Sequence, residues 1–296
     1  MKIGISEWYP GAGHRAGRWS IESAQLIEEL GFNSVWLPEH VVFMPRYDSR
    51  YPYEESGATE VNATRGVHDP LVLAGAIAAA TERVRIGTYV MVIPQRNPIV
   101  TARQIASVDQ LSGGRFSVGV GVGWSAEEYA VLDVPFERRG ARMDEYLRVM
   151  KATWAEDELT EFHGEFVDFP PLYAFPKPVQ RPHPPIIVGG NSPATLRRIV
   201  ELGDGWAGYS QSYDDIARFT EELEKRLTAA GRSRAEVSLR VGRRAKGKTE
   251  KDWEDDAVYI RRCAELGLDE VVVSPRIGDE NYERDMTRYA EIVGLR

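Results

Sequence analysis

Short apolar runs alternate with longer amphipathic segments along almost the whole chain. Eight of these runs predict buried strands, at residues 2–6, 34–38, 85–93, 115–121, 185–189, 205–209, 237–241 and 270–274. Apolar residues at helical spacing predict helices from residue 20, from residue 70 and at residues 98–111, 138–154, 193–202, 213–230, 250–266 and 280–293. Ser20 and Asp69 are placed to cap the first two helices. Helices between buried strands indicate a parallel sheet, and eight units indicate its closure.

One joint between a helix and a strand occurs three times. Glu-Leu-Gly ends a predicted helix at residues 29–31, 201–203 and 265–267, and a short apolar run follows each copy. Glycine can take the left-handed conformation that ends a helix. The repeated joint predicts a βα repeat, and the chain is long enough for one closed (β/α)8 barrel, a TIM barrel, over residues 1–296.

Two segments are longer than the loops of such a repeat. Residues 41–67 follow the second strand and are rich in aromatic residues and proline. This insertion leaves the C-terminal face of the barrel, so we expect it to cover a substrate, with a purely structural flap as the alternative. Residues 155–184 precede the fifth strand and predict a hairpin followed by an extended, proline-rich segment.

Composition narrows the partners of the chain. The formal net charge of -8 and the pI near 5.4 argue against nucleic acid or an anionic membrane as the main partner and favour a small molecule. The N-terminal residues have no signal-peptide pattern and no run of ~18 apolar residues occurs, so we expect a cytoplasmic protein. The single cysteine, Cys263, lies in a helical pattern and is expected in the core.

The second predicted strand ends at Glu39 and His40, where catalytic groups gather in a closed barrel. Adjacent residues of a regular strand point to opposite faces, so the two need not form one pair, although a bend at the strand end could turn both toward the mouth. Histidine titrates near neutrality and is the usual proton donor. The alternative is a structural histidine bonded in the rim.

Glycines end two of the predicted strands. In Gly119-Val120-Gly121-Val122-Gly123 the spacing is not that of the dinucleotide-binding fingerprint. Its alternating glycines would admit a flat ring or a phosphate, or would serve close packing inside the barrel. Gly189-Gly190-Asn191-Ser192-Pro193 places free backbone amides at a helix start, which suits an anion, with an ordinary capped turn as the alternative.

Basic residues follow the last two predicted strands. Arg243, Arg244, Lys246 and Lys248 come after the seventh strand, and Arg276 comes after the eighth. These loops are the habitual phosphate site of such barrels, while a solvated run of charges is the alternative for the lysines. No spacing typical of metal ligands occurs in the sequence.

Several motifs in a fixed order resemble the luciferase-like monooxygenase superfamily. They are Val35-Trp36-Leu37-Pro38-Glu39-His40, Pro94-Gln95-Arg96-Asn97-Pro98, Gly119-Val120-Gly121-Val122-Gly123-Trp124, Glu137-Arg138-Arg139-Gly140-Ala141-Arg142, Pro176-Lys177-Pro178-Val179-Gln180 and Gly203-Asp204-Gly205-Trp206. The resemblance covers nearly the whole chain. Within the superfamily the chain is most similar to the actinobacterial proteins regarded as coenzyme F420-dependent oxidoreductases.

The resemblance implies a TIM barrel with an insertion, commonly dimeric, that binds a flavin or deazaflavin at its C-terminal mouth. It places Glu39 and His40 beside the ring as catalytic residues, with His40 as proton donor. It implies that Tyr89 and Val90 form a supporting bulge, a non-proline cis peptide in some members, that Gly121 and Gly123 border the ring next to Trp124, and that Gly189, Gly190 and Asn191 contact the tail. Arg243 and Arg276, from the basic loops, complete the expected cofactor-binding residues. Relatives that oxidise glucose 6-phosphate carry a glutamate in place of Trp124, so the resemblance does not imply that substrate.

The function expected from this resemblance is hydride transfer between coenzyme F420 and a small organic substrate, with His40 exchanging a proton. An FMN-dependent monooxygenase that uses reduced flavin and oxygen is the alternative within the same fold. A non-catalytic flavin-binding protein is a third possibility of a different class.

Overall fold

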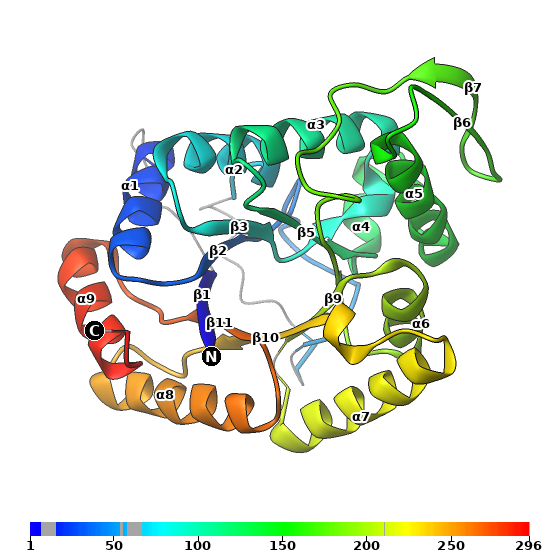
Figure 1. The fold of residues 1–296 in the computed structure, drawn as a ribbon. Coiled ribbons are helices and arrows are strands. Elements are labelled where there is room, and N and C mark those ends of the chain that lie inside the picture. Colours follow the sequence, from blue (N-terminus) through cyan, green and yellow to red (C-terminus); the bar gives the residue numbers. More distant parts are fainter. Residues whose placement is uncertain (7–15, 54–55, 58–66, 210, 296) are drawn as a thin grey trace.

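The structure is a computed structural model that describes residues 1–6, 16–53, 56–57, 67–209 and 211–295. Within these residues parallel strands close into a barrel through a pairing of β3 with β5 (Figure 1). In barrel order the strands are β3 (Arg85–Thr88), β2 (Ser34–Leu37), β1 (Lys2–Ser6), β11 (Glu270–Ser274), β10 (Ser238–Arg244), β9 (Gly205–Tyr209), β8 (Ile186–Gly189) and β5 (Phe116–Gly121). The predicted (β/α)8 barrel is confirmed.

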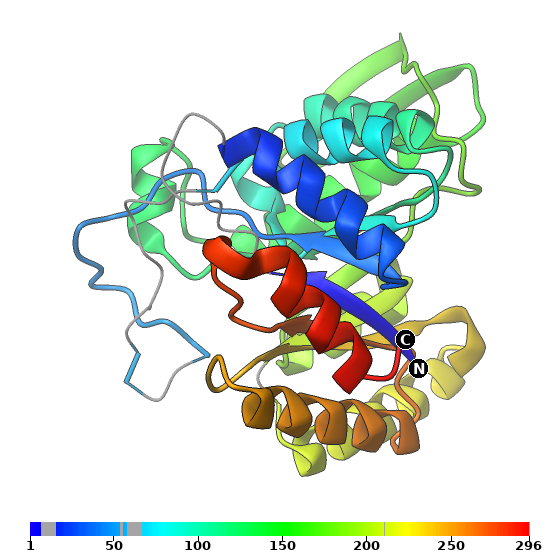
Figure 2. The ribbon, with the colours of Figure 1, turned by 90° about the vertical axis from the view of Figure 1, so that its left-hand side faces the viewer.

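Helices surround this barrel as an outer ring (Figures 1 and 2). They are α1 (Ala16–Glu29), α2 (Pro70–Ala80), α3 (Pro98–Leu111), α5 (Arg139–Trp154), α6 (Pro193–Leu202), α7 (Tyr213–Ala229), α8 (Glu250–Glu265) and α9 (Tyr282–Ile292). Asp69 caps α2 as predicted, because its carboxylate accepts the amides of Leu71 and Val72 at 2.9 and 3.1 Å. The prediction for Ser20 is wrong, since α1 begins at Ala16 and Ser20 lies buried inside the helix.

The third strand is broken where the sequence predicted one continuous strand. A cis peptide joins Tyr89 to Val90, which is not a proline, and separates β3 from β4 (Met91–Val92). The short β4 pairs with β5, and the 3-10 turn η1 (Ile93–Gln95) leads into α3. The bulge that the resemblance implied in this strand is therefore present.

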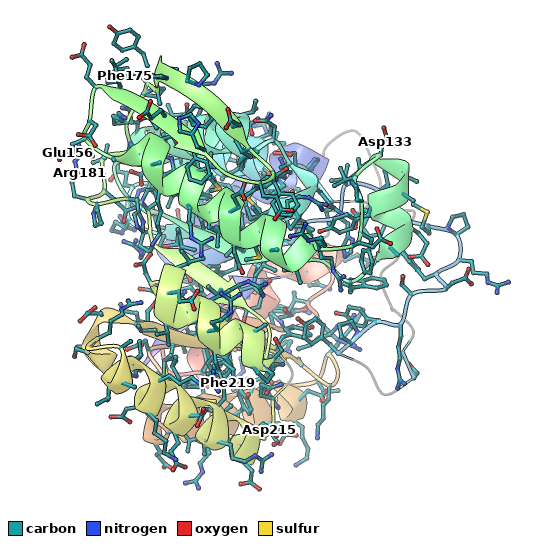
Figure 3. The ribbon with its side chains drawn as sticks, turned by 90° about the vertical axis from the view of Figure 1, so that its right-hand side faces the viewer. Asp133, Glu156, Phe175, Arg181, Asp215 and Phe219 are labelled. Atoms are coloured by element: carbon teal, nitrogen blue, oxygen red, sulfur yellow. The ribbon has the colours of Figure 1, made fainter. Side chains whose placement is uncertain are left out.

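Further elements lie outside the ring. A short helix, α4 (Ala126–Val131), follows β5 and was not expected from the sequence. The predicted hairpin is present as the antiparallel pair β6 (Leu159–His163) and β7 (Asp168–Tyr173), which stands out from the barrel beside α5 (Figure 3). Two 3-10 turns, η2 (Arg234–Glu236) and η3 (Asp279–Asn281), precede β10 and α9.

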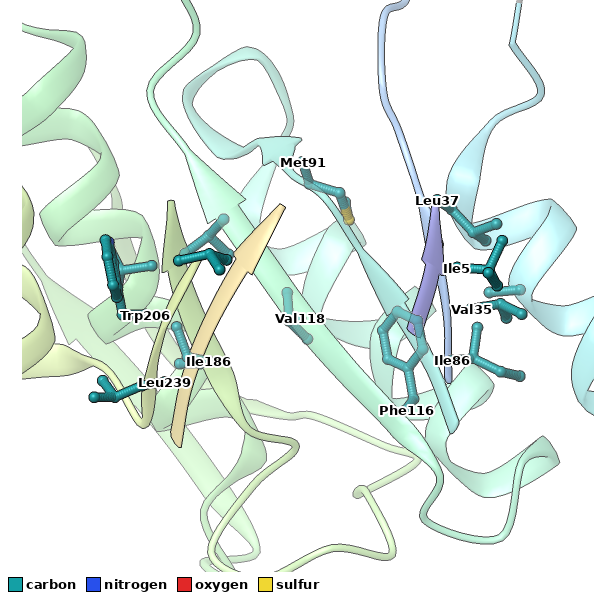
Figure 4. Packing of buried hydrophobic residues seen from close by; sticks show 14 of the residues in the cluster. Ile5, Val35, Leu37, Ile86, Met91, Phe116, Val118, Ile186, Trp206 and Leu239 are labelled. Carbon is teal, nitrogen blue, oxygen red and sulfur yellow. The ribbon is translucent and has the colours of Figure 1, made fainter. Parts of the chain in front are cut away.

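The main core lies between the barrel and the helix ring. Outward residues of the strands such as Val35, Phe116 and Ile186 are almost fully buried there (Figure 4). Each such side chain contributes ~1.5–3 kcal/mol by leaving water. Cys263 lies in this core as predicted, and burial raises the pKa of its thiol to about 11. Within the described residues, no helix is long and apolar enough to span a membrane.

The glycines at the end of β5 make room for the bulge. A side chain at Gly119 would overlap the carbonyl of Thr88, and a Cβ at Gly121 would lie 2.7 Å from Val90 Cγ2. A Cβ at Gly189 would lie 2.9 Å from Val90 Cγ1. Of the two interpretations that the sequence left open for these glycines, the structure supports close packing inside the barrel.

Replacing Gly121 by alanine is predicted to lower the free energy of unfolding by about 1–3 kcal/mol, the usual effect of overpacking a full interior. Gly75→Ala is the matched control, because Gly75 lies inside α2 and a Cβ there meets nothing within 4 Å. The control is expected to gain up to ~1 kcal/mol from helix propensity. Urea denaturation measures both, and equal stabilities for the two variants would contradict the packing role of Gly121.

Candidate active site

The carboxyl ends of the strands bring most of the residues indicated by the sequence to one face. His40 follows β2, Trp124 follows β5 and Arg276 follows β11. Tyr89 and Val90 interrupt the third strand, and Gly189 ends β8. Residues 41–53 of the insertion project from this same face, on the left of Figure 2. The arrangement is that of a TIM-barrel active site.

His40 is held by Glu128, a residue that the sequence did not indicate. Its Nδ1 lies 3.3 Å from Glu128 Oε2, and the Glu128 side chain is 3% exposed. Glu128 Oε1 also accepts the amides of Val41 and Val42 at 2.6 and 3.3 Å. Burial acts to raise the pKa of Glu128. The hydrogen bond from His40, the positive charge of the His40 ring and the hydrogen bonds from the two backbone amides outweigh burial and lower the pKa.

The ionised Glu128 fixes the tautomer of the imidazole. A carboxylate without a proton can only accept, so the Nδ1 of His40 must carry the hydrogen that lies between them. Nε2 is then the ring nitrogen that can gain or lose a proton. The ring of His40 is 17% exposed and lies near the rings of Phe43 and Trp124, at centroid distances of 5.1 and 6.0 Å.

Glu39 turns away from His40, into the wall of the barrel. Its carboxylate forms an ion pair with Arg96, whose Nε lies 2.9 Å from Oε1, and accepts the amide of Val92 at 2.6 Å. Burial raises the pKa of this carboxyl, although Arg96 and the Val92 amide act in the opposite direction. These contacts fix β4 in place, and a catalytic role for Glu39 stays a prediction that they do not favour.

The start of α4 anchors the insertion. Glu127 Oε1 accepts the amides of Asp48 and Ser49 at 2.7 and 2.8 Å, and Ser49 Oγ accepts the amide of Ala126 at 3.0 Å. Glu128 holds the beginning of the same insertion, at Val41 and Val42. Neighbouring carboxylates therefore fix residues 41–49 against the barrel rim. Ser125, which caps α4 by accepting the amide of Glu128, gave a sequence signal for this helix that was missed.

Aromatic rings of the insertion extend across the mouth from one strand end to another. Trp124 contacts Tyr47 and Tyr51 at centroid distances of 5.0 and 5.2 Å. Tyr51 contacts Tyr53 at 5.5 Å, and Tyr53 contacts Tyr209 at the end of β9 at 5.4 Å. The insertion thus spans from β5 to β9, which supports the interpretation that it covers a substrate. Its residues 54–55 and 58–66 lie outside the described residues.

The floor of this mouth is apolar and closely packed. Tyr89 and Val90 pack on an inner cluster that contains Trp36, Ile187 and Val272. The Tyr89 hydroxyl donates to the carbonyl of Gly208, and its ring meets Trp36 edge-on at 5.7 Å. The bulge therefore presents a rigid apolar surface, which a flat ring could lie against.

The start of α6 is suited to an anionic group. Gly190 has a left-handed φ of 110°, and the exposed Asn191 and Ser192 follow it. Ser192 caps the helix by accepting the amide of Thr195 at 3.2 Å. The positive end of the helix dipole therefore faces outward at the carboxyl end of β8. Contact of these residues with a cofactor tail stays a prediction.

The basic residues are placed differently from what the sequence suggested. Arg243 and Arg244 were expected in a loop, but both belong to β10, where they pair with Val273 and Ser274. Arg243 faces the helix ring, bonded to Asp256 at 2.6 Å and stacked on Tyr259 at 4.4 Å, which does not favour contact with a cofactor. By alternation Arg244 points into the barrel instead.

Comparison with known proteins gives the class. The family described as luciferase-like monooxygenase matches residues 9–260, and the chain belongs to this family of enzymes. An uncharacterized protein of Mycobacterium tuberculosis strain H37Rv is 35% identical over 251 residues, 84% of each chain. The FMNH(2)-dependent dimethylsulfone monooxygenase of Pseudomonas putida is 31% identical over 211 residues, 70% of this chain and 53% of that enzyme.

A solved structure confirms the fold over the whole length. An F420-dependent secondary alcohol dehydrogenase, in complex with an F420-acetone adduct, is similar with a TM-score of 0.77 at 18% identity, covering 99% of this chain and 98% of that one. The family match confirms the expectation of a luciferase-like enzyme, and the solved structure confirms the TIM barrel. The proteins to which this chain is similar include both F420-dependent and FMN-dependent enzymes.

Glu127→Gln is predicted to loosen the insertion at neutral pH, because an uncharged amide is a weaker acceptor for the amides of Asp48 and Ser49. Hydrogen exchange of those amides should become several-fold faster. Glu224→Gln, at an exposed position of α7, is the matched control and should leave them unchanged. Unaltered exchange in Glu127→Gln would contradict the anchoring role.

The pH dependence of the same contact has a definite sign. Burial acts to raise the pKa of Glu127, but the bonds from residues 48 and 49 outweigh it and lower the pKa from 4.5 to about 2. A carboxyl with a lowered pKa stabilises the fold above its ordinary value and loses that contribution as pH falls through the folded value. Exchange at Asp48 and Ser49 should therefore accelerate, beyond its intrinsic pH dependence, only between about pH 4.5 and 2.

Proposed function

We propose that the chain is an oxidoreductase that transfers a hydride between coenzyme F420 and a small organic substrate, with His40 exchanging the accompanying proton. The observation that carries this proposal is the His40–Glu128 pair at the same end of the barrel as the bulge at Tyr89 and Val90. It combines a group able to exchange protons with an apolar surface for a flat ring. Both lie at the C-terminal mouth of a luciferase-like barrel.

The residues present fit a deazaflavin or flavin. Val90 and Tyr89 would support the ring, with Trp124 at its edge. Gly189, Gly190 and Asn191 would hold the phosphate-bearing tail at the start of α6, where the helix dipole favours a negative charge. When bound, the cofactor would supply or accept two electrons as a hydride.

The chemistry of this chain's own residues is proton transfer and exclusion of water. A hydride added to a neutral carbonyl leaves a negative oxygen, which becomes neutral when it takes one proton. Nε2 of His40 would give that proton, or take it in the reverse direction, while Glu128 holds Nδ1–H and stabilises the charged imidazole. The aromatic rings of Tyr47, Tyr51 and Tyr53 would cover the substrate, which favours a small, largely apolar organic molecule.

An FMN-dependent monooxygenase is the second candidate. The observation in its favour is the relative of 31% identity, which is named as an FMNH(2)-dependent monooxygenase. The same floor, tail site and His40–Glu128 pair would serve it, since FMN has a similar ring and a phosphate. A non-catalytic flavin-binding protein is disfavoured, because binding alone does not require a buried carboxylate that fixes the histidine tautomer.

A homodimer is also proposed. An apolar groove of about 380 Å³ runs between α3, α5 and the end of β7, and its lining includes Val100, Trp154 and Tyr173. The exposed Phe175 lies at its edge (Figure 3). A second copy of the chain would cover the exposed Val100, Tyr173 and Phe175. A cytoplasmic location stays a prediction.

Coenzyme F420 is predicted to bind more tightly than FMN. Its tail ends in carboxylates, and Arg244, Arg276 and Lys246 lie at the ends of β10 and β11 as complementary charges. Fluorescence titration of the apoprotein with each cofactor at moderate salt measures the difference. Arg276→Gln should weaken F420 more than FMN, while Lys251→Gln on the exposed face of α8 is the control. Equal or stronger binding of FMN would favour the monooxygenase instead.

His40→Ala is predicted to leave cofactor affinity nearly unchanged and to reduce turnover by ~100-fold or more, the usual contribution of a positioned general acid. Glu128→Gln should also lower turnover, and the double variant should be no slower than His40→Ala, because Glu128 acts through His40. Turnover is measured with a substrate obtained from a screen of carbonyl compounds and alcohols. Additive losses, or loss of the cofactor in His40→Ala, would contradict the proposed role.

A further inference from the structure

We propose that the opposite, N-terminal mouth of the barrel is a second ligand site, for a small dianion such as a phosphate or a short dicarboxylate. A cavity of about 550 Å³ opens there, at the starts of the strands. Its lining includes Lys2, Ser34, Arg85, Arg240 and Glu270, from five different strands. His40 and the insertion lie at the other end of the barrel, so this cavity is separate from the candidate active site.

The strand register turns three cations into this cavity. Residues directly opposite each other in a parallel sheet share a face, and Lys2 and Arg240 are both opposite Glu270. Arg85 is opposite Ser34, whose hydroxyl donates to Glu270 inside the barrel. Lys2, Arg85 and Arg240 therefore all face the interior, with Arg85 two residues further along the register than Lys2, because Ser34 is opposite Gly4.

The charge of this inner layer is not balanced. Glu270 is its carboxylate, and it already accepts bonds from Asn33, Ser34 and Arg240. In the part of the chain that the structure describes, the side chains of Lys2 and Arg85 form no ion pair or hydrogen bond. Three cations and one carboxylate make this innermost part of the cavity locally positive, while its rim adds Arg234 and the carboxylates of Asp204, Glu236 and Asp269, so that the whole lining carries four charges of each sign.

The acidic side chains at the rim have partners of their own. Asp269 accepts the amide of Leu239 at 2.7 Å and lies 3.4 Å from Arg234. Asp204 accepts the amide of Ile186 at 2.8 Å. Glu236 caps η2 and pairs with Arg232. Each of these carboxylates thus has a structural task at the rim of the cavity.

Arg240 supplies a donor that lacks an acceptor. The residue is 7% exposed, its Nε bonds Glu270 at 3.2 Å and its Nη2 bonds Ser238 Oγ at 3.0 Å. Nη1 is buried and has no hydrogen-bond partner within the described residues. A buried charged donor without a partner is unfavourable. A carboxylate or phosphate oxygen is the acceptor that a guanidinium binds best.

Trp36 closes the top of the cavity and separates the two mouths. Its indole donates to Ser34 Oγ at 2.7 Å and carries the Arg240 guanidinium 4.7 Å from its ring. Glycines make room for the indole, since a Cβ at Gly4 would lie 2.9 Å from its Nε1 and a Cβ at Gly87 would overlap its six-membered ring. The other side of Trp36 packs on Tyr89, in the floor of the candidate active site. The dianion would therefore bind below the cofactor and would not replace any part of it.

Isothermal titration with inorganic phosphate and with malonate, at constant ionic strength set with chloride, tests this proposal. We expect one saturable site for at least one of the two anions, and the tighter anion identifies the chemistry of the ligand. Arg85→Gln should raise its dissociation constant by about tenfold or more, as for a charge-assisted bond. Lys2→Gln should act in the same direction.

Arg83→Gln is the matched control, because Arg83 is exposed on the outside of the barrel beside Glu28. It should leave the dissociation constant within about twofold of wild type, well below a tenfold change. Arg85 is half-buried and free of ion pairs within the described residues, so its variant should fold normally, which circular dichroism checks. The proposal is overturned if neither anion shows saturable binding or if Arg85→Gln binds the anion as tightly as wild type. Displacement of the anion by FMN would also overturn it, because the anion would then be bound at the C-terminal mouth.

Discussion

The ion pair between Glu39 and Arg96 is the interaction on which the candidate active site depends. It joins the second residue after β2 to the segment that enters α3, and the same carboxylate accepts the amide of Val92 in β4. Arg96 also bonds Asp69 at 2.9 Å, which caps α2. Loss of Arg96 would leave the buried carboxylate of Glu39 without a counter-ion, an effect of about 3–5 kcal/mol. The position of β4, and with it the bulge at Val90, follows from this network.

The rest of the site is arranged around that fixed bulge. Val90 fills the space that glycines leave at the ends of β5 and β8, so the floor is rigid. The side chains of Glu39 and His40 point in different directions. Glu39 points into the barrel wall, and His40 points toward Glu128 in α4. Glu127 and Glu128 then tie the insertion to the rim, which brings its aromatic rings over the floor. The end of β2 thus fixes the position of the bulge in the floor, of His40 and of the insertion that covers the mouth.

The sequence predicted what local patterns determine. Buried runs and glycine-ended helices gave the barrel, and Asp69 before Pro70 gave a correct cap. Contacts between segments that are far apart in the sequence could not be predicted from local patterns. Glu128 lies 88 residues from His40 in the sequence, so nothing in the local pattern linked them. Arg243 and Arg244 were misplaced because β10 continues beyond its apolar run. The bulge at Val90 was expected only from the family resemblance.

Hydrogen exchange with and without a bound cofactor tests the central claim most directly, which is that the C-terminal mouth is the cofactor site. Addition of saturating F420 or FMN is predicted to slow exchange of the backbone amides at residues 41–49 and at the start of α6, around Asn191 and Ser192. Amides at the N-terminal edge, around η2 and the start of β10, should not change. Protection confined to that N-terminal edge, or protection of neither region, would contradict the account.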